Sequence, residues 1–409
     1  MRHSRHCIQI FGLFLLIATA APAAMAQSLA FTRVTVIDVR DGTVRPNTTV
    51  VVTGNRITAV GPVGAVEIPS GATVIDGTGR FLIPGLWDMH AHTTTDRNTR
   101  EVIFPLLVAH GVTGIRSMAA DCFETGEPNC EEEGSSATLA TIEDVRRWRR
   151  EMASGDLVGP RVVAGSYYVN SPPPGELSTS QYPRTAEHGR AHARLLHGRG
   201  VDFVKVYDML SREAYFALAD EADRLGLPFA GHTPIAVRAS EASDAGQVSI
   251  EHLGMGNVLE ECSSREDDLR QRLIAVFQKA EMGSRHTSDG PAILPLVLEM
   301  VETHDAEKCA ALAERFVQNR TWVVPTLMIA RLPSELGRGW REDPYARFLP
   351  PDERRYFEWA EETYARDPGD PPARAPYSRW VREVTGTMHR AGVRMLAGSD
   401  AGELASSGA

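Results

Sequence analysis

FLIPGLWDMHAH, residues 81–92, joins an apolar run and a Pro-Gly pair to two histidines that one alanine separates. Successive side chains of a β-strand point to opposite faces, so His90 and His92 would lie on the same side of a strand. Two imidazoles that converge in this way suit a divalent metal such as zinc. Because an H-x-H pair also occurs as an ordinary half-exposed polar pair, the metal interpretation depends on finding further ligands.

Short apolar runs recur after Pro84 and alternate with helical patterns, which is typical of repeated βα units. The clearest helix is predicted between Ser211, which can cap its start, and Gly226, which can end it. Eight runs are present, at residues 82–92, 111–118, 160–168, 201–208, 227–234, 248–254, 321–327 and 393–400. The pattern predicts an α/β fold, a (β/α)8 TIM barrel whose active site lies at the carboxyl ends of the strands.

Polar residues fall at or near the ends of these runs, where a barrel gathers its functional side chains. They are His90, His92, Lys205, His232, His252 and Asp400. Each has an ordinary alternative role: a strand-end histidine can be a hydrogen-bonded structural residue, a strand lysine can extend to solvent, and an aspartate can cap a helix. Their joint occurrence in order on successive strand ends favours a metal site.

The N-terminus has the pattern of a secretory signal peptide. A basic segment precedes the apolar run IFGLFLLIATAA and the triplet Ala24-Met25-Ala26, so we expect cleavage after Ala26. Residues 27–80 alternate apolar and polar positions between turn residues, which predicts a small antiparallel, β-sandwich-like unit. We therefore expect a signal peptide at 1–26, the β unit at 27–80 and the barrel at 81–409. The mature protein would be periplasmic or secreted.

Composition limits the classes of partner. The formal net charge is -10 and the sequence pI is about 5.8, and no Lys/Arg-rich run occurs, which argues against nucleic acid as the main partner. No later stretch is long and apolar enough to span a membrane, so we expect no membrane association after signal cleavage. A small-molecule substrate is the expected partner, and the sequence leaves the oligomeric state, including a homo-oligomer, open.

Four cysteines follow the signal peptide, and an even number in an exported protein favours disulfides. Cys122 and Cys130 bracket a short acidic loop, whereas Cys262 and Cys309 flank a long segment. The simplest pairing is Cys122 with Cys130 and Cys262 with Cys309. Four unpaired buried thiols are the alternative, and a zinc-cysteine site is disfavoured because no C-x2-C pair occurs.

The ordered motifs PGLWDMHAH, FVKVY, GHTP, SIEHLG and AGSDA resemble those of the amidohydrolase superfamily of metal-dependent hydrolases. The likeness runs from about residue 30 to about residue 402. It implies that His90, His92 and Asp400 bind a first divalent metal, with zinc the expected ion. It also implies that Asp400 is catalytic, because a carboxylate there can take a proton from the attacking water and deliver it to the leaving group.

The same resemblance implies a second metal, bound by His232 and His252. Lys205 would bridge the two ions as N6-carboxylysine, a carbamate formed with carbon dioxide. An ammonium cannot ligate a cation, whereas a carbamate offers two oxygens and a negative charge, and apolar surroundings favour the free amine that carbon dioxide needs. Lys205 is therefore expected to take part in catalysis as well as in metal binding.

The motifs around Lys205 resemble the exported branch related to imidazolonepropionase-like proteins and to dipeptidases acting on Xaa-Pro or Xaa-Arg bonds. The resemblance implies an exported hydrolase that cleaves amide bonds of small peptides or N-acyl amino acids through a hydroxide held between the metals. Tyr207 would contact the substrate, or would instead be an aromatic residue of a barrel layer. Esterase, lactonase or phosphotriesterase activity on the same metals, and an inactive metal-binding fragment, are the alternatives.

The C-terminus departs from the family pattern. Members normally continue past the eighth strand with a last helix and with strands that complete the small β unit, but only nine residues follow Asp400 here. We expect the chain to be a fragment of a longer protein. The alternative is a barrel with an open seam and an incomplete β unit.

Overall fold

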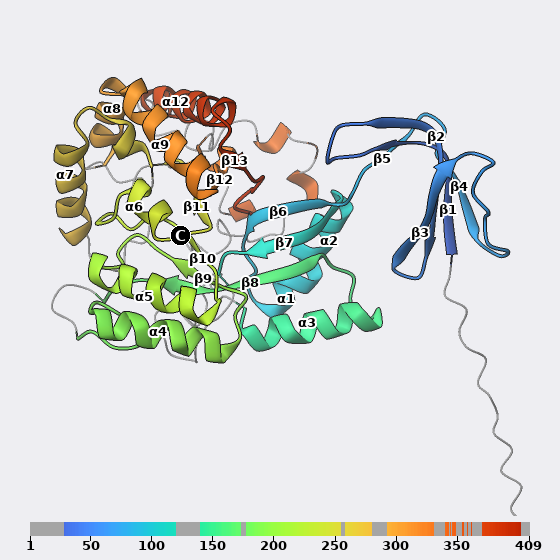
Figure 1. Ribbon diagram of the computed structural model, residues 1–409, viewed down its shortest axis with the longest axis horizontal. Helices are drawn as coiled ribbons and strands as arrows, with labels where there is room; N and C mark the ends of the chain where they lie inside the picture. Colours follow the sequence, from blue (N-terminus) through green and yellow to red (C-terminus); the bar gives the residue numbers. More distant parts are fainter. Residues whose placement is uncertain are drawn as a thin grey trace, which may run out of the picture. The chain divides into compact units, whose positions relative to one another are not determined.

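The computed structural model describes residues 28–119, 140–172, 177–254, 258–279, 293–330 and 370–401, with short pieces between residues 340 and 361 (Figure 1). The expected signal peptide and the Cys122–Cys130 pair lie outside the described residues. The chain divides into two compact units, one ending at Pro84 and the other beginning at Gly85.

The N-terminal unit is a five-stranded sheet built around the long strand β1 (Ser28–Ile37). β2 (Val44–Thr53) pairs antiparallel with β1, and β3 (Arg56–Pro62) pairs antiparallel with β2. β4 (Thr73–Asp76) and β5 (Phe81–Leu82) pair with β1 in the parallel sense. The expectation of a purely antiparallel unit is thus wrong, because the long segment after β3 carries the chain across to the other edge of β1.

The second unit contains a sheet of eight parallel strands, which confirms the predicted barrel architecture. The strands run in chain order across the sheet, so each neighbour in space is also a neighbour in sequence. They are β6 (Leu86–Ala91), β7 (Val112–Ser117), β8 (Arg161–Val169), β9 (Phe203–Val206), β10 (Phe229–Gly231), β11 (Ser249–Glu251), β12 (Trp322–Val324) and β13 (Arg394–Met395). Seven of the strands fall within the predicted runs, and β8 extends one residue beyond its run, to Val169.

The two edges of this curled sheet are joined just beyond β13. The Asp400 amide donates to the His90 carbonyl at 2.7 Å, and the His92 amide donates to the Ala401 carbonyl at 2.7 Å. Ala91 and Ala401 also form a parallel bridge. The first and last predicted runs are therefore hydrogen-bonded to each other, and the seam that could have stayed open is joined.

Helices cover the outside of the sheet (Figure 1). They are α1 (Asp96–Asn98), the π-helix η1 (Thr99–Ile103), α2 (Phe104–Ala109), α3 (Ile142–Ser154), α4 (Ala186–Arg199), α5 (Arg212–Leu225), α6 (Ala239–Asp244), α7 (Glu266–Lys279), α8 (Leu294–Glu302), α9 (Ala306–Asn319) and α12 (Asp370–Arg390). The predicted caps of α5 are confirmed: the Ser211 hydroxyl accepts from the Ala214 amide, and Gly226 ends the helix in a left-handed conformation. None of these helices in the described part of the chain combines the length and apolarity that a membrane crossing requires.

A disulfide joins Cys262 to Cys309, as the even cysteine count predicted. Cys262 ends the short 3-10 helix η2 (Leu259–Cys262), which follows β11, and Cys309 lies in α9. Both residues are buried in the apolar core between the sheet and its helices. The bond thus ties the segment after β11 to the helix that leads into β12.

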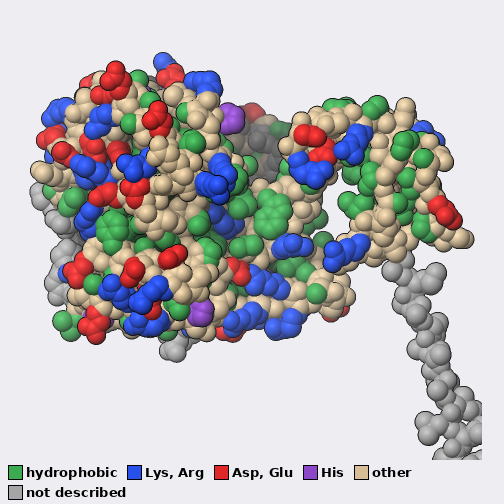
Figure 2. Space-filling view, in the orientation of Figure 1, with side chains coloured by type: hydrophobic (Ala, Val, Ile, Leu, Met, Phe, Trp, Pro, Cys, Tyr) green, Lys and Arg blue, Asp and Glu red, His purple; other side chains and the backbone are tan. Residues whose placement is uncertain are grey.

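On the viewed face, basic and acidic side chains are interspersed over the outer helices (Figure 2).

Candidate metal centre

All six predicted site residues lie at the carboxyl ends of the barrel strands. His90 is the penultimate residue of β6, and Lys205 is the penultimate residue of β9. The other four follow directly or closely after a strand: His92 after β6, His232 after β10, His252 after β11 and Asp400 after β13. The fold therefore brings to one end of the barrel residues that are up to 310 positions apart in the chain.

His90, His92 and Asp400 form a compact buried group. The Oδ1 atom of Asp400 lies 3.1 Å from Nε2 of His90 and 2.9 Å from Nε2 of His92. One possible ligand atom from each residue lies within 4.8 Å of the other two, and each residue is only 1% exposed. Two imidazole nitrogens and a carboxylate oxygen at this spacing are a donor set that fits zinc or a similar divalent metal.

The remaining three predicted residues border this group. The rings of His90 and His252 are 4.6 Å apart, and those of His252 and His232 are 4.8 Å apart. Nε2 of His252 lies 3.9 Å from Oδ2 of Asp400. Lys205 is 1% exposed and acts electrostatically on each of these histidines. Among the described residues, the group of three close ligand atoms is that of His90, His92 and Asp400, and His232, His252 and Lys205 lie beside it.

In all four histidines Nδ1 contacts a neighbouring side chain, and in His90 and His92 Nε2 also contacts Asp400. The Nδ1 contacts join His90 to Glu251 at 2.8 Å, His92 to Tyr168 at 3.3 Å, His232 to Asp208 at 2.6 Å and His252 to Thr326 at 2.5 Å. A partner on one ring nitrogen fixes the tautomer and the orientation of the ring, and leaves the other nitrogen for a metal. Because Nδ1 is used in this way, Nε2 is the nitrogen with which each ring would bind a metal, and in His90 and His92 it faces the Asp400 carboxylate.

Burial and charge shift the pKa values in this centre. Burial lowers the pKa of His92 and His232, and it lowers that of His252 well below the ordinary value, so these rings favour the neutral form that ligates metals. Burial acts in the same direction on His90, but the carboxylates of Asp400 and Glu251 outweigh it and raise the pKa of that ring.

A left-handed backbone conformation and the carboxylate of Asp88 shape the turn that contains Asp400. Asp400 has a φ of 61° and His252 a φ of 60°, left-handed conformations that non-glycine residues adopt at a cost of about 1–2 kcal/mol. Asp88 accepts from the backbone amides of His90 and Ser399, each at 3.0 Å, and from the Ser399 hydroxyl. Asp88 therefore binds β6 to the turn that presents Asp400.

Two tyrosines form an aromatic wall beside the histidines. The ring of Tyr207 lies 4.3 Å from that of His232 and 4.6 Å from that of Tyr168. Nζ of Lys205 is 5.8 Å from the Tyr207 ring centre and 6.0 Å from that of Tyr168. Both tyrosines are half-buried, so part of each side chain is accessible to solvent.

The sequence alone did not single out Asp208, Tyr168 and Thr326, the partners that orient three of the histidines. Asp208 directly follows the FVKVY motif, Tyr168 ends the third apolar run, and Thr326 lies in the seventh. Arg116 offered the clearest missed signal, since it is a charged residue inside the apolar run GVTGIRSM and is 6% exposed. A buried arginine requires a buried partner, and that requirement points toward the carboxylates of the barrel interior.

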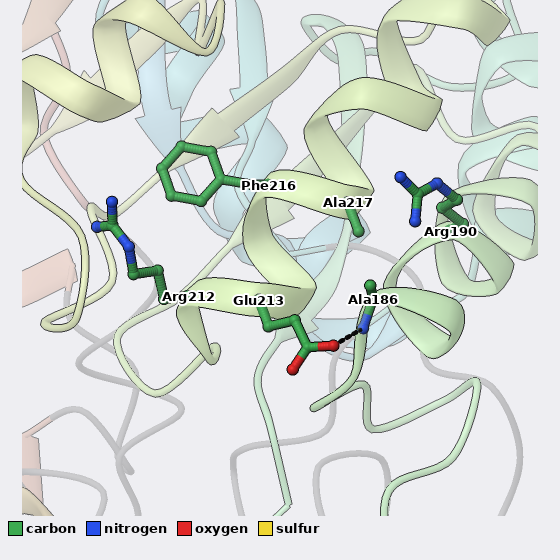
Figure 3. Close-up of a pocket in the computed structure, with 6 residues that line it drawn as sticks. All are labelled: Ala186, Arg190, Arg212, Glu213, Phe216 and Ala217. Atoms are coloured by element: carbon green, nitrogen blue, oxygen red, sulfur yellow. Dashed lines mark hydrogen bonds between the residues drawn. The ribbon is translucent and has the colours of Figure 1, made fainter.

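A surface pocket of about 560 Å³ lies away from this centre, on the outer helices (Figure 3). It is lined by Ala186, Arg190, Arg212, Glu213, Phe216 and Ala217, all from α4 or α5. Glu213 accepts from the Ala186 amide at 3.0 Å and so caps the start of α4. The pocket lining has a single carboxylate, Glu213, and no histidine or cysteine, so it offers no group of converging metal ligands. We therefore place the candidate site at the strand ends.

No protein-family model matches the chain. The adenine deaminase 2 of Bradyrhizobium sp. (strain ORS 278) is 26% identical over 217 residues, 53% of this chain and 34% of that protein. The adenine deaminase of Paracoccus denitrificans (strain Pd 1222) is 33% identical over 79 residues, 19% of this chain and 13% of that protein. The chain thus spans about a third or less of the length of these curated relatives.

Solved structures resemble the chain over most of its length. A bottromycin amidohydrolase matches 91% of this chain and 68% of its own chain, with a TM-score of 0.59 and 22% identity. A Xaa-Pro dipeptidase with bound methionine matches 92% of this chain and 80% of its own, with a TM-score of 0.53 and 17% identity. These likenesses show that the chain has the fold of these two hydrolases.

Proposed function

We propose that this chain is an exported hydrolase that uses two divalent metals to cleave amide bonds of small peptides or N-acyl amino acids. The observation that carries the proposal is the convergence of His90, His92 and Asp400, whose ligand atoms lie within 4.8 Å of one another. His232, His252 and Lys205 would hold the second ion. Bound divalent metals would supply Lewis acidity and lower the pKa of a water toward neutrality.

Asp400 is the group best placed to move a proton. Its Oδ1 atom contacts both His90 and His92, while Oδ2 faces His252 at 3.9 Å. A carboxylate in this position accepts the proton of the attacking water and donates it to the leaving amine, which is general base and then general acid catalysis. Its burial excludes competing water from the proton path.

The choice of C–N bonds is supported by the names of the similar proteins. Amidohydrolase, dipeptidase and deaminase are all names of enzymes that break C–N bonds. The aromatic wall of Tyr168 and Tyr207 offers an apolar surface beside the reacting centre, as a peptide side chain or proline ring would need. Deamination of adenine is a second candidate, which the curated relatives favour by name.

A substrate panel separates these functions. The protein, loaded with zinc in the presence of bicarbonate, would be assayed with Xaa-Pro and Xaa-Arg dipeptides, N-acyl amino acids, adenine, lactones and phosphotriesters. We expect amine release from a dipeptide or N-acyl amino acid and a loss of at least about 100-fold in kcat for Asp400→Asn. Turnover of adenine alone, or of the esters alone, would overturn the amide proposal. Zinc binding without any turnover would favour the non-catalytic alternative.

Export is tested separately. Expression of the full chain in a bacterium with a periplasm should give a mature protein that begins at Gln27, as mass spectrometry of the intact chain can determine. A cytoplasmic product that retains Met1 would contradict export without affecting the proposed chemistry.

A further inference from the structure

A charged cluster lies inside the barrel, next to the metal-ligand candidates. Arg116 on β7 is 6% exposed, and Ser249 and Glu251 on β11 are 1% and 0% exposed. Burying an arginine and a glutamate is costly unless their charges and hydrogen-bonding groups are paired.

Each nitrogen of the Arg116 guanidinium has a partner, and these partners lie on the strands β6 and β11. Nε donates to the Met89 carbonyl at 2.6 Å, one residue before His90. Nη1 donates to the Ser249 hydroxyl at 2.7 Å, and Nη2 donates to Oε1 of Glu251 at 2.6 Å. Because the guanidinium is a rigid planar fork, these three bonds fix the Glu251 carboxylate relative to β6.

The second carboxylate oxygen of Glu251 reaches a ligand candidate. Oε2 lies 2.8 Å from Nδ1 of His90. A carboxylate accepts hydrogen bonds but does not donate them, so Nδ1 of His90 carries the proton in this contact. Nε2, the ring atom that lies 3.1 Å from Asp400, is then left for a metal.

We propose that Arg116 and Glu251 are positioning residues that hold His90 in the tautomer able to bind a metal through Nε2, and so set the zinc affinity of the centre. The inference rests on the metal site of the proposed function and assigns a role to two residues outside the ligand set. Arg116 orients the carboxylate and balances its charge. Glu251 orients the imidazole and increases its electron donation to a metal.

The test is zinc affinity, measured by competition with a chromophoric chelator. Glu251→Gln keeps the size of the side chain but removes its charge and permits the amide to donate to Nδ1. We expect zinc binding about 10–100-fold weaker than in the wild type. Arg116→Lys keeps the charge but loses the fork, and a smaller loss is expected. Glu266→Gln is the matched control: Glu266 is also buried and paired with arginines, but it lies on α7, and its replacement should leave zinc affinity unchanged.

A second measurement does not depend on the variants folding. The 15N spectrum of zinc-loaded wild-type protein should show the His90 proton on Nδ1 and the metal on Nε2. A proton on Nε2, or zinc affinities of both folded variants within twofold of the control, would overturn the proposal. Zinc binding that depends on Glu251 without any turnover would leave this inference standing while the hydrolase proposal fails. Wild-type protein that binds no zinc would overturn both.

Discussion

Gly231, the residue before His232, is expected to be intolerant of any side chain. Its φ is +133°, outside the region that other residues adopt, and a Cβ atom there would lie 2.2 Å from the Val206 carbonyl oxygen and 2.9 Å from the Val206 nitrogen. The same Cβ would lie 3.0 Å from Cδ of Lys205. Gly231→Ala therefore presses on the backbone of β9 and on the lysine proposed to bridge the metals.

The expected cost has three parts. Forcing alanine into this backbone conformation costs about 1–3 kcal/mol. Overlap with the Val206 backbone costs about 1–3 kcal/mol more, and the 3.0 Å hydrogen bond from the His232 amide to the Val206 carbonyl, worth about 1 kcal/mol, is lost. The total of about 3–7 kcal/mol is a large fraction of the 5–15 kcal/mol by which domains are usually stable.

Urea unfolding of the wild type, Gly231→Ala and Gly246→Ala measures this difference. Gly246 also has a positive φ, +87°, but a Cβ atom there would meet no atom within 4 Å, so its replacement should cost only about 1–2 kcal/mol of conformational strain. We expect Gly231→Ala to lose several times more unfolding free energy than the control, with reduced zinc content. Equal losses in the two variants would refute the close-packing argument.

Two further predictions concern residues away from the metal centre. Burial lowers the pKa of His192 from its ordinary value of 6.5 to about 4. As the pH falls, the unfolded chain therefore binds the proton before the folded chain does. The stability that is fully present above pH 6.5 should decline by about 3 kcal/mol toward pH 4. Urea unfolding across this range should show the decline in the wild type and a flatter profile in His192→Gln; an identical pH profile in the variant would contradict it. The Cys262–Cys309 disulfide closes a loop with a sequence separation of 47, so Cys309→Ala should lower the free energy of unfolding by about 4 kcal/mol under oxidising conditions. An unfolding midpoint unaffected by that change or by reductant would show that the bond is absent or without effect.

The strand positions could be predicted because their signals are local. Each of the eight apolar runs matches a strand to within one residue beyond its ends, and Ser211 and Gly226 cap α5 as predicted. The parallel pairing of β4 and β5 with β1 could not be read from the sequence, since alternation predicts a strand but not the direction of its partner.

The ligand candidates were predictable for a related reason. A barrel places every strand end at one rim, so order along the chain is enough to predict that His90 and Asp400 approach each other. The partners of His92, His232 and His252 were not predicted, because a contact such as that of Tyr168 with His92 joins residues of two different strand ends. Such a contact depends on strand stagger and side-chain rotamer, which no local pattern specifies.

The most direct test of the account is the number of zinc ions bound per chain. Wild-type protein and Lys205→Ala would each be reconstituted with zinc and bicarbonate, freed of loosely bound metal, and analysed by elemental mass spectrometry. The two-metal centre predicts two ions in the wild type and at most one in Lys205→Ala, because the bridge between the metals is lost. One tightly bound ion in both proteins would contradict the account.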